Sequence, residues 1–155
     1  MNNAAKGFTL IELTVVLVIA GLLLSLTGPS VRSFYETVKY RETVRELTSA
    51  AKNARRWARA NGKAYDLVID PIQNRFALTS QAASLKQRDY KTLAQNLDIE
   101  FVYAAEVSSV GDLGAIRFYP SGGSSGGEII IQRPSGSGIQ LTIDWLLGDV
   151  SQEEL

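Results

Sequence analysis

The most constraining feature of this sequence is a run of 20 residues near its beginning, Phe8 to Thr27, that carries one charged residue, Glu12. As a helix rising about 1.5 Å per residue, the run would extend about 30 Å, which is enough to cross a bilayer. A carboxylate in hydrocarbon costs on the order of 2.5–3.5 kcal/mol even on the mildest scales. The sequence therefore predicts that Glu12 has a function and a charged partner.

Two ordinary interpretations of this run each leave part of it unexplained. A secretory signal peptide needs a basic segment before the apolar run and small residues before a cleavage site. Here Lys6 is the only basic residue before the run, and SLTGPS at residues 25–30 is a poor cleavage site. A simple signal anchor accounts for the length and the hydropathy of the run, but it gives no reason for Glu12.

The string KGFTLIEL at residues 6–13 supports a third interpretation. It resembles the cleavage and methylation motif of type IV prepilins and of type II secretion prepseudopilins. The resemblance implies that residues 1–7 are a leader peptide, that a prepilin peptidase cuts between Gly7 and Phe8, and that it methylates the new amine of Phe8. It also implies that Glu12 is an assembly residue, which pairs with the N-terminal amine of an adjacent subunit. Such a pairing can be strongly favourable in low dielectric.

Apolar residues continue at helical spacing beyond this run, at Val31, Phe34, Val38, Val44, Leu47, Ala51, Ala54 and Ala58. Steps of three and four predict an amphipathic helix, and Asn61-Gly62 is a typical helix end. We expect one long helix like that of pilins. Residues 8–28 would be its transmembrane and assembly half, and residues 29–61 its amphipathic half.

Past Gly62 the apolar period changes from 3.6 to 2, which indicates short strands. We expect them at residues 64–69, 75–79, 97–103, 115–119, 128–132, 139–143 and 146–150. A loop at residues 70–74 would close a first hairpin, and Ser80 to Asn96 would be a surface loop with one helical turn. The predicted fold is α+β and pilin-like, with the helix packed on an antiparallel, two-sheet, β-sandwich-like domain over residues 62–155.

Two stretches near the C-terminus indicate which family of pilin-like proteins this chain resembles. IRFYPSGGSSGGEIIIQ at residues 116–132 resembles the F-x-P-x-G-x-x-x-G-x-I hairpin of the GspH/FimT family of minor pilins and pseudopilins. Members commonly end with a Gly followed by a basic residue, and clustered arginines mark those linked to DNA uptake. Here Asp149 follows Gly148, and Glu153 and Glu154 come soon after. Acids repel phosphate, so this departure favours the pseudopilin branch.

The charge of the chain is balanced overall but unevenly distributed. The 16 basic and 16 acidic residues cancel, yet nine basic residues face three acids between Arg32 and Lys63, and six face twelve from Ala64 onward. A basic helix face carries Lys52, Arg55, Arg56, Arg59 and Lys63. We interpret it as solvated or as meeting the acidic surface of a neighbouring subunit, and we expect no nucleic-acid partner. Heterologous contacts of this kind permit open assembly.

The residues expected at such an interface come from this helix face and from the loop at residues 121–127, which we call the glycine-serine loop. They are Arg55, Arg59, Ser121, Gly122 and Gly123. Loops with small residues tolerate ordering on contact with a partner.

Catalysis finds little support in the sequence. Cysteine and histidine are absent, which removes thiol chemistry and the commonest general base. Asp66, Asp70 and Asp144 could in principle act as acid and base, but no supporting constellation accompanies them. Asp66 and Asp70 are expected to be ordinary solvent-facing acids of a strand and its turn. We expect no enzyme activity, no metal and no cofactor.

The resemblance implies a minor pseudopilin of the type II secretion system, at or near the tip of the periplasmic pseudopilus that drives export of folded proteins across the outer membrane. Its partners would be the major pseudopilin, other minor pseudopilins, the prepilin peptidase and the inner-membrane assembly platform, with contact to secreted substrates left open. It would cross the bacterial inner membrane once, with its C-terminal domain in the periplasm, and be extracted into the pseudopilus. The alternatives are a FimT-like minor pilin of a type IV pilus, in pilus assembly or DNA uptake, and a membrane-anchored enzyme.

Overall fold

The structure is a computed structural model that describes residues 8–80, 85–104 and 113–155, with the backbone alone over residues 24–33. The chain divides into two compact units, Met1–Val38 and Lys39–Leu155. Helix α1, Leu10–Asn61, contributes to both units. It ends where the sequence predicts, because Gly62 follows it with a φ of 62°, a left-handed conformation that glycine adopts without steric cost.

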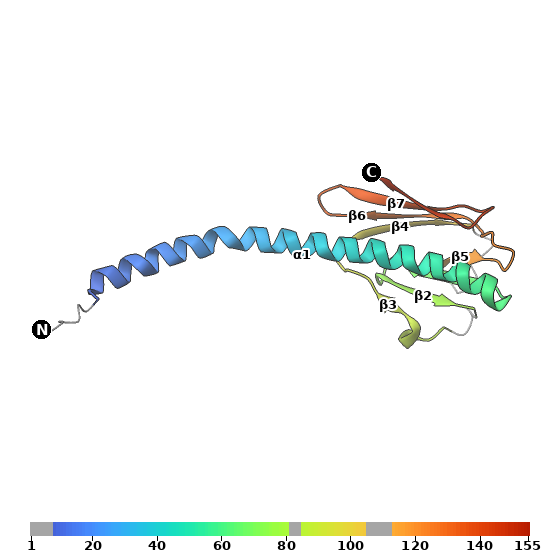
Figure 1. The fold of residues 1–155 in the computed structure, drawn as a ribbon, viewed down its shortest axis with the longest axis horizontal. Helices are drawn as coiled ribbons and strands as arrows, with labels where there is room; N and C mark the ends of the chain where they lie inside the picture. The colour runs from blue at the N-terminus through green and yellow to red at the C-terminus, as the bar shows by residue number, and fades with distance from the viewer. Residues whose placement is uncertain (1–7, 81–84, 105–112) are drawn as a thin grey trace, which may run out of the picture. The chain divides into compact units, whose positions relative to one another are not determined.

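The first unit is described mainly by the N-terminal part of α1, drawn in blue in Figure 1. Large apolar side chains from Leu10 to Leu23 are exposed on it. Among the helices of the described residues, none is both long and apolar enough to cross a membrane. The predicted division of the helix at residue 28 into a transmembrane half and an amphipathic half stays a prediction.

The second unit contains two antiparallel sheets, which confirms the predicted α+β, pilin-like fold. The first sheet has the order β3-β2-β1-β5, with β1 at Tyr65–Asp70, β2 at Arg75–Thr79, β3 at Lys91–Thr92 and β5 at Gly114–Phe118. The second sheet has the order β4-β6-β7-β8, with β4 at Asp98–Tyr103, β6 at Gly127–Gln132, β7 at Gly138–Ile143 and β8 at Val150–Glu154. A short 3-10 helix, Gln87–Asp89, matches the helical turn expected between Ser80 and Asn96.

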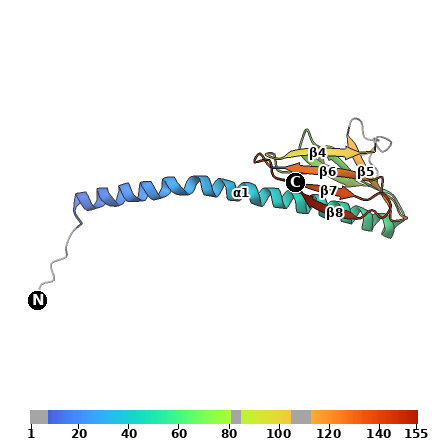
Figure 2. The same ribbon diagram turned by 90° about the horizontal axis from the view of Figure 1, so that it is seen from above.

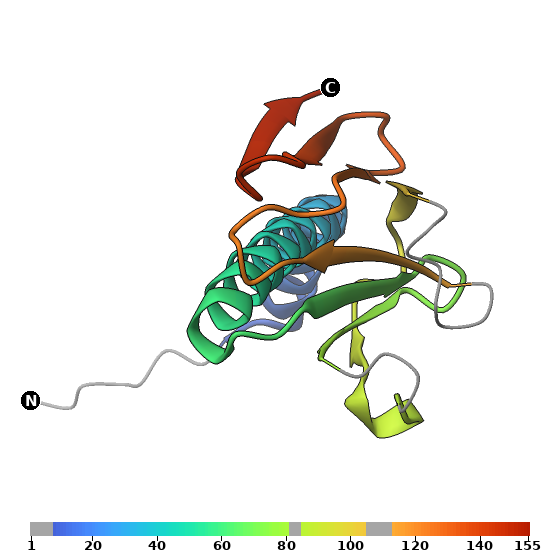
Figure 3. The same ribbon diagram turned by 90° about the vertical axis from the view of Figure 1, so that its right-hand side faces the viewer.

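The core of the second unit lies between α1 and the two sheets. The helix contributes a stripe of buried residues that the sequence predicted, namely Val44, Leu47, Ala51, Ala54 and Ala58. They join Leu67, Ile69, Ile116 and Phe118 of the first sheet and Ile129, Ile131, Leu141 and Ile143 of the second in one cluster. Figure 3, which looks along α1, shows both sheets adjoining the helix. Figure 2 shows β8 as the strand of the second sheet that lies beside it.

Strand β1 corrects the expectation for two carboxylates. Asp66 and Asp70 are only 4% and 3% exposed, because β1 is a central strand with side chains buried on both of its faces. Each is paired with an arginine. Arg117 donates to both Asp66 oxygens at 2.7 and 2.8 Å, and Arg75 donates to Asp70 at 2.9 Å. Hydrogen bonding to Asp66 raises the pKa of the Arg117 guanidinium, and burial opposes this rise.

The last predicted strand, at residues 146–150, is wrong. Residues 144–149 form a turn, and β8 begins only at Val150. The Asp144 carboxylate accepts a hydrogen bond from the Leu147 amide at 2.6 Å, and Gly148 has a φ of 64°. Both features stop the extended backbone, although the Trp-Leu-Leu sequence has strand-like composition. The two-residue strand β3 was not predicted.

The glycine-serine loop also differs from its prediction, because it is a crossover between sheets and not a simple hairpin. It begins as a hairpin, with the Tyr119 amide bonded to the Gly123 carbonyl at 2.9 Å and the Ser125 amide to the Arg117 carbonyl at 2.8 Å. The chain then leaves through Gly126, which has a φ of 72°, so that β5 lies in the first sheet and β6 in the second. Strands β6 and β7, which follow the crossover, pair with each other as an antiparallel hairpin within the second sheet.

The turn at residues 144–149 packs closely on this crossover. The Ser124 amide donates to the Trp145 carbonyl at 2.9 Å, and the Ser124 hydroxyl donates to the Asp144 carbonyl at 2.8 Å. A Cβ on Gly148 would lie 2.7 Å from the Gly122 carbonyl oxygen. Position 148 therefore requires glycine both for its backbone conformation and for this approach.

Removal of the Arg117 side chain is the first test of this packing. We expect Arg117→Met to destabilise the fold by about 3–5 kcal/mol, because Asp66 is left buried without its cation. Arg88→Met is the control, because Arg88 is exposed and its nitrogen lies as far as 3.8 Å from the Asp89 carboxylate. Such a surface pair should contribute at most about 1 kcal/mol. Chemical unfolding followed by circular dichroism measures both variants, and equal stabilities would contradict the assignment.

A pair of glycine substitutions tests the approach of the turn to the crossover. Gly148→Ala and Gly136→Ala both place a Cβ at positive φ, which costs about 1–2 kcal/mol. Only Gly148→Ala also brings it against backbone, because nothing lies within 4 Å of a Cβ on Gly136. Thermal unfolding should therefore show a clearly larger loss of Tm for Gly148→Ala. Similar losses would mean that the two loops are not in contact.

Candidate assembly sites

The N-terminal candidate site contains Phe8 and Glu12. Gly7, which precedes the bond predicted to be cleaved, lies outside the described residues. Phe8 is 80% exposed, and Glu12 lies in the first turn of α1. The Glu12 amide donates to the Thr9 hydroxyl at 3.3 Å and to the Thr9 carbonyl at 3.1 Å. Thr9 thus caps the helix.

This helix cap gives the N-terminal site a local structural role, which was not predicted from the sequence. Thr9-Leu10-Ile11-Glu12 fits the T-x-x-E pattern of a capping box, which was readable in the sequence. An acid in the first turn also interacts favourably with the helix dipole. Glu12 therefore has a local electrostatic reason for its position, in addition to any partner on another subunit.

The surface around Glu12 is apolar on all sides of the helix. Eight large apolar residues from Leu10 to Ile19 have exposed fractions of 52–85%. They are Leu10, Ile11, Leu13, Val15, Val16, Leu17, Val18 and Ile19. A helix that is apolar all round is typical of one buried in a larger assembly or in lipid.

The predicted interface residues at the other candidate site come together in the structure. Arg59 and the buried Gly122 are adjacent, because a Cβ on Gly122 would lie 3.8 Å from Arg59 Cδ. Gly123 lies under the Trp145 carbonyl, and Ser121 is exposed beside them. Helix α1, the crossover and the turn at residues 144–149 thus meet at one place.

Arg55 differs from the others, because it is engaged within the chain. Its guanidinium forms an ion pair with Asp149, and its aliphatic part lies 3.5 Å from a Cβ built on Gly148. The acid that follows Gly148 is therefore bound to the basic helix face of the same molecule. The predicted role of Arg55 in a contact between subunits stays a prediction. Arg59 is more exposed than Arg55.

The turn also exposes three consecutive apolar side chains, of which the second and third were expected in a strand at residues 146–150. Trp145, Leu146 and Leu147 are 68%, 61% and 56% exposed. We call these three residues the apolar turn. A run of exposed large apolar side chains is uncommon on a soluble surface and typical of an interaction site.

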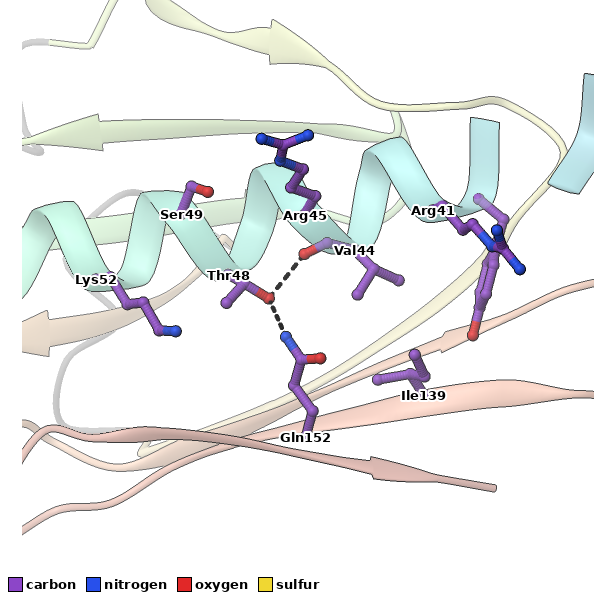
Figure 4. Close-up of a pocket in the computed structure, with 9 residues that line it drawn as sticks. Arg41, Val44, Arg45, Thr48, Ser49, Lys52, Ile139 and Gln152 are labelled. Atoms are coloured by element: carbon purple, nitrogen blue, oxygen red, sulfur yellow. Dashed lines mark hydrogen bonds between the residues drawn. The ribbon is translucent and has the colours of Figure 1, made fainter. Parts of the chain in front are cut away.

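A groove lies between α1 and the edge of the second sheet (Figure 4). We call it the basic groove, and it is lined from the helix by Tyr40, Arg41, Val44, Arg45, Thr48, Ser49 and Lys52 and from the sheet by Ile139 and Gln152. The Gln152 amide donates to the Thr48 hydroxyl at 2.8 Å, and this hydroxyl donates to the Val44 carbonyl at 2.8 Å. These bonds hold β8 against the helix.

The charge of the basic groove is positive. Within the part of the chain that the structure describes, no carboxylate forms an ion pair with Arg41, Arg45 or Lys52. At one end, the Arg133 guanidinium lies over the Tyr40 ring, 4.8 Å from its centroid. Burial raises the pKa of the Tyr40 phenol, Arg133 lowers it and Glu154 raises it.

No arrangement for catalysis emerges around the three carboxylates considered in the sequence. Asp66 and Asp70 are bound to Arg117 and Arg75, and Asp144 caps its own turn. Among residues 8–80, 85–104 and 113–155, no cluster of acidic side chains could hold a metal ion.

Comparison with known proteins gives matches in both sequence and fold. Residues 2–28 match the prokaryotic N-terminal methylation motif. The chain is 26% identical over 150 residues to type II secretion system protein H of Xanthomonas campestris pv. campestris, covering 97% of this chain and 84% of that protein.

Two solved structures share the fold. The minor pseudopilin EpsH from the type 2 secretion system of Vibrio cholerae matches with a TM-score of 0.57 and 13% identity, over 74% of this chain and 96% of that one. The type IV minor pilin FimU of Pseudomonas aeruginosa matches with a TM-score of 0.56 and 16% identity, over 77% and 92%. Together, the motif, the similarity along the sequence and the fold confirm the predicted resemblance to GspH-like minor pseudopilins, and the chain shares the fold of EpsH and FimU.

Proposed function

We propose that this chain is a minor pseudopilin of the type II secretion system, which assembles at or near the tip of a periplasmic pseudopilus. The observation that carries the proposal is the similarity to type II secretion system protein H along 97% of the chain, with the methylation motif at its start. The subunit is anchored in the inner membrane by its apolar helix, with the second unit in the periplasm. Its role is structural, in a filament that drives the export of folded proteins.

The N-terminal site supplies the chemistry of assembly. Cleavage between Gly7 and Phe8 creates an amine at Phe8, and Glu12 lies about one helical turn away on the same apolar surface. Two such helices packed in parallel can bring the amine of one subunit to the carboxylate of the next. This ion pair gains strength from the low dielectric of the surrounding apolar side chains, while leaving either charge unpaired there is costly.

The expected partners follow from this role. They are the major pseudopilin, other minor pseudopilins and the inner-membrane assembly platform, together with the prepilin peptidase that processes the N-terminus. Arg59 and the exposed part of the crossover, Ser121, are available to contact neighbouring subunits. The ion pair with Asp149 offsets the positive charge of Arg55 near the turn at residues 144–149. This disfavours the phosphate backbone of a nucleic acid as a partner.

A minor pilin of a type IV pilus is the second candidate function. It is favoured by one observation, the match of the fold to FimU at a TM-score similar to that of EpsH.

The experiment that tests the proposal is crosslinking in intact cells, followed by purification of the full-length protein and mass spectrometry of its N-terminus and partners. We expect an N-methylated Phe8 as the first residue and crosslinked pseudopilins of a secretion system. Methylated Phe8 with type IV pilins as partners would establish the second candidate. An intact Met1 without a pilin-like partner would overturn both.

A variant of Glu12 separates processing from assembly. We expect Glu12→Gln to leave cleavage between Gly7 and Phe8 unchanged, because both residues of the cleaved bond are retained. We expect recovery of the subunit with its crosslinked partners to fall by about tenfold or more, since loss of the ion pair costs more than the roughly 1.4 kcal/mol that a factor of ten represents. Glu42→Gln, an exposed acid on the same helix, is the matched control. Equal recovery of the two variants would remove Glu12 from the assembly step.

A further inference from the structure

We propose that the outer edge of β8 and the basic groove beside it together bind an extended, acidic segment of another protein, which adds to the second sheet as a further strand. In contacts of this kind, backbone hydrogen bonds supply affinity and alternate side chains supply specificity. The inference goes beyond the proposed function, because it holds whether the chain serves in a secretion pseudopilus or in a type IV pilus.

Strand β8 pairs with a neighbouring strand on one edge only. The order β4-β6-β7-β8 places it at the end of the second sheet, where it pairs with β7. The Asp144 amide donates to the Asp149 carbonyl at 2.9 Å, and the Leu155 amide donates to the Gly138 carbonyl at 3.0 Å. The backbone groups of successive residues alternate between the two edges of a strand. Residues 149, 151, 153 and 155 therefore face β7.

The outer edge of β8 carries the backbone amides and carbonyls of Val150, Gln152 and Glu154. Among the described residues, no other group is hydrogen-bonded to them. Edge strands are commonly protected by proline or lysine. Strand β8 has the sequence VSQEE, which contains neither residue and places its two acids at the end of the strand. This edge is therefore open to a further strand.

The side chains of the same three residues face α1. The Gln152 side-chain amide donates to the Thr48 hydroxyl, as Figure 4 shows, and Leu141, the register partner of Gln152 on β7, is completely buried. Because side chains alternate along a strand, residues 150, 152 and 154 share this face. A strand added at the outer edge would direct every second side chain toward the basic groove.

Strand β8 and the basic groove run side by side over a similar length. Asp149, just before β8, contacts Arg55, and Gln152 in the middle of β8 contacts Thr48. The strand thus runs opposite to α1, and Figure 2 shows it beside the helix. The cations of the groove extend from residue 41 to residue 52, a rise of about 16 Å along the helix. Five extended residues span about the same distance.

The charge of the groove favours carboxylates on the added strand. Arg41, Arg45 and Lys52 are exposed, and no carboxylate among the described residues forms an ion pair with them. Glu154 is the carboxylate on the α1-facing side of β8, and it lies near Tyr40 at one end of the groove. An acidic side chain placed near Arg45 or Lys52 would therefore gain a cation without meeting an acid of β8.

The floor of the groove provides apolar contacts between these cations. Tyr40 and Val44 of the helix and Ile139 of β7 line it, and its volume is about 380 Å³. Volumes of this size accommodate a few side chains. The aliphatic parts of acidic side chains can pack on this floor while their carboxylates reach the cations.

A nucleic acid is the competing occupant, since the same cations attract phosphate. Phosphate has no donor for the free carbonyls of β8, so it would leave this edge unused. Glu153 and Glu154 at the edge would also repel a charged backbone. A peptide strand can direct its carboxylates into the groove and place neutral side chains beside Glu153, which faces the opposite side of the sheet. An acidic peptide is therefore favoured.

The test uses the full-length, isotope-labelled chain in detergent micelles and a synthetic heptapeptide in which Glu alternates with Thr, raised to millimolar concentration. Hydrogen exchange followed by NMR reports on each amide. We expect the amides of Gln152 and Glu154 to exchange about tenfold more slowly with the peptide, because they gain hydrogen bonds. Those of Ser151 and Glu153, which face β7, should be protected without it. A peptide with Lys in place of Glu is the control and should change nothing.

Two substitutions at residue 154 separate strand addition from simple charge attraction. Glu154→Ala removes the carboxylate and keeps the amide, so it should leave the affinity for the acidic peptide unchanged or raise it. Glu154→Pro removes the outward amide as well, and proline is tolerated at such a position of an edge strand. Circular dichroism checks that both variants fold. We expect Glu154→Pro to bind the peptide about fivefold more weakly than Glu154→Ala, through loss of one hydrogen bond.

The contribution of the groove is tested by neutralising two of its cations. Arg45→Gln with Lys52→Gln should weaken peptide binding by about tenfold or more, since each removes a charge that faces the added strand. Arg56→Gln with Arg88→Gln is the matched control, because both arginines are exposed and lie outside the groove lining. This control should leave the affinity unchanged.

Four outcomes would overturn the inference. Unchanged exchange at Gln152 and Glu154 would leave the edge without a ligand of this class. Equal peptide affinity of Glu154→Pro and Glu154→Ala would mean attraction to a charged surface without strand addition. A single-stranded oligonucleotide that displaces the peptide and leaves both amides unprotected would assign the groove to nucleic acid. Protection of both amides without peptide, in a dimer detected by sedimentation, would assign the edge to a second copy.

The proposed function is tested separately, by methylation of Phe8 and by crosslinking to pilin-like proteins. Either proposal can therefore fail alone.

Discussion

The arrangement of the second unit depends on the burial of one stripe of α1 against two sheets at once. Ala51, Ala54 and Ala58 are completely or almost completely buried, and Leu47 is the largest residue of the stripe. Because alanine extends only one methyl group from the backbone, the strands can approach the helix closely along its last turns. A larger residue in this row would separate a sheet from the helix, since close-packed interiors do not absorb added volume without strain.

Burial of this stripe determines which surfaces remain for partners. The opposite face of the helix stays in solvent and carries most of the basic residues, among them Arg41, Arg45 and Arg59. The edge strand β8 lies against the helix through Gln152 and Thr48, which forms one wall of the basic groove. The crossover and the turn at residues 144–149 close the end of the unit. Candidate contact surfaces are therefore by-products of the way the core is assembled.

The sequence predicted the elements that have a clear period or an explicit stop signal. The buried stripe from Val44 to Ala58, the helix end at Gly62 and most strands were readable, because core contacts and glycine conformations leave local patterns. The methylation motif also identified Phe8 and Glu12 as the residues to examine.

What the sequence did not predict depends on contacts between distant residues. The burial of Asp66 follows from Arg117, 51 residues away, and the position of β1 in the middle of its sheet. The assignment of Leu146 and Leu147 to a strand failed because the Asp144 carboxylate accepts a hydrogen bond from the Leu147 amide, and this turn overrides their strand propensity. The pairing of Arg55 with Asp149 spans 94 residues and has no local signature.

In the turn at residues 144–149, the residues that determine the backbone path differ from those that form its exposed surface. Its backbone path is fixed by Asp144, Gly148 and the carbonyl contacts of Ser124. The exposed apolar side chains at positions 145, 146 and 147 project from this frame, and the hydrogen bonds that define it do not involve them. Exchange of these three residues would therefore change what the end of the molecule recognises while the fold stays the same. A scaffold of this kind allows subunits with one architecture to acquire different neighbours through very few substitutions.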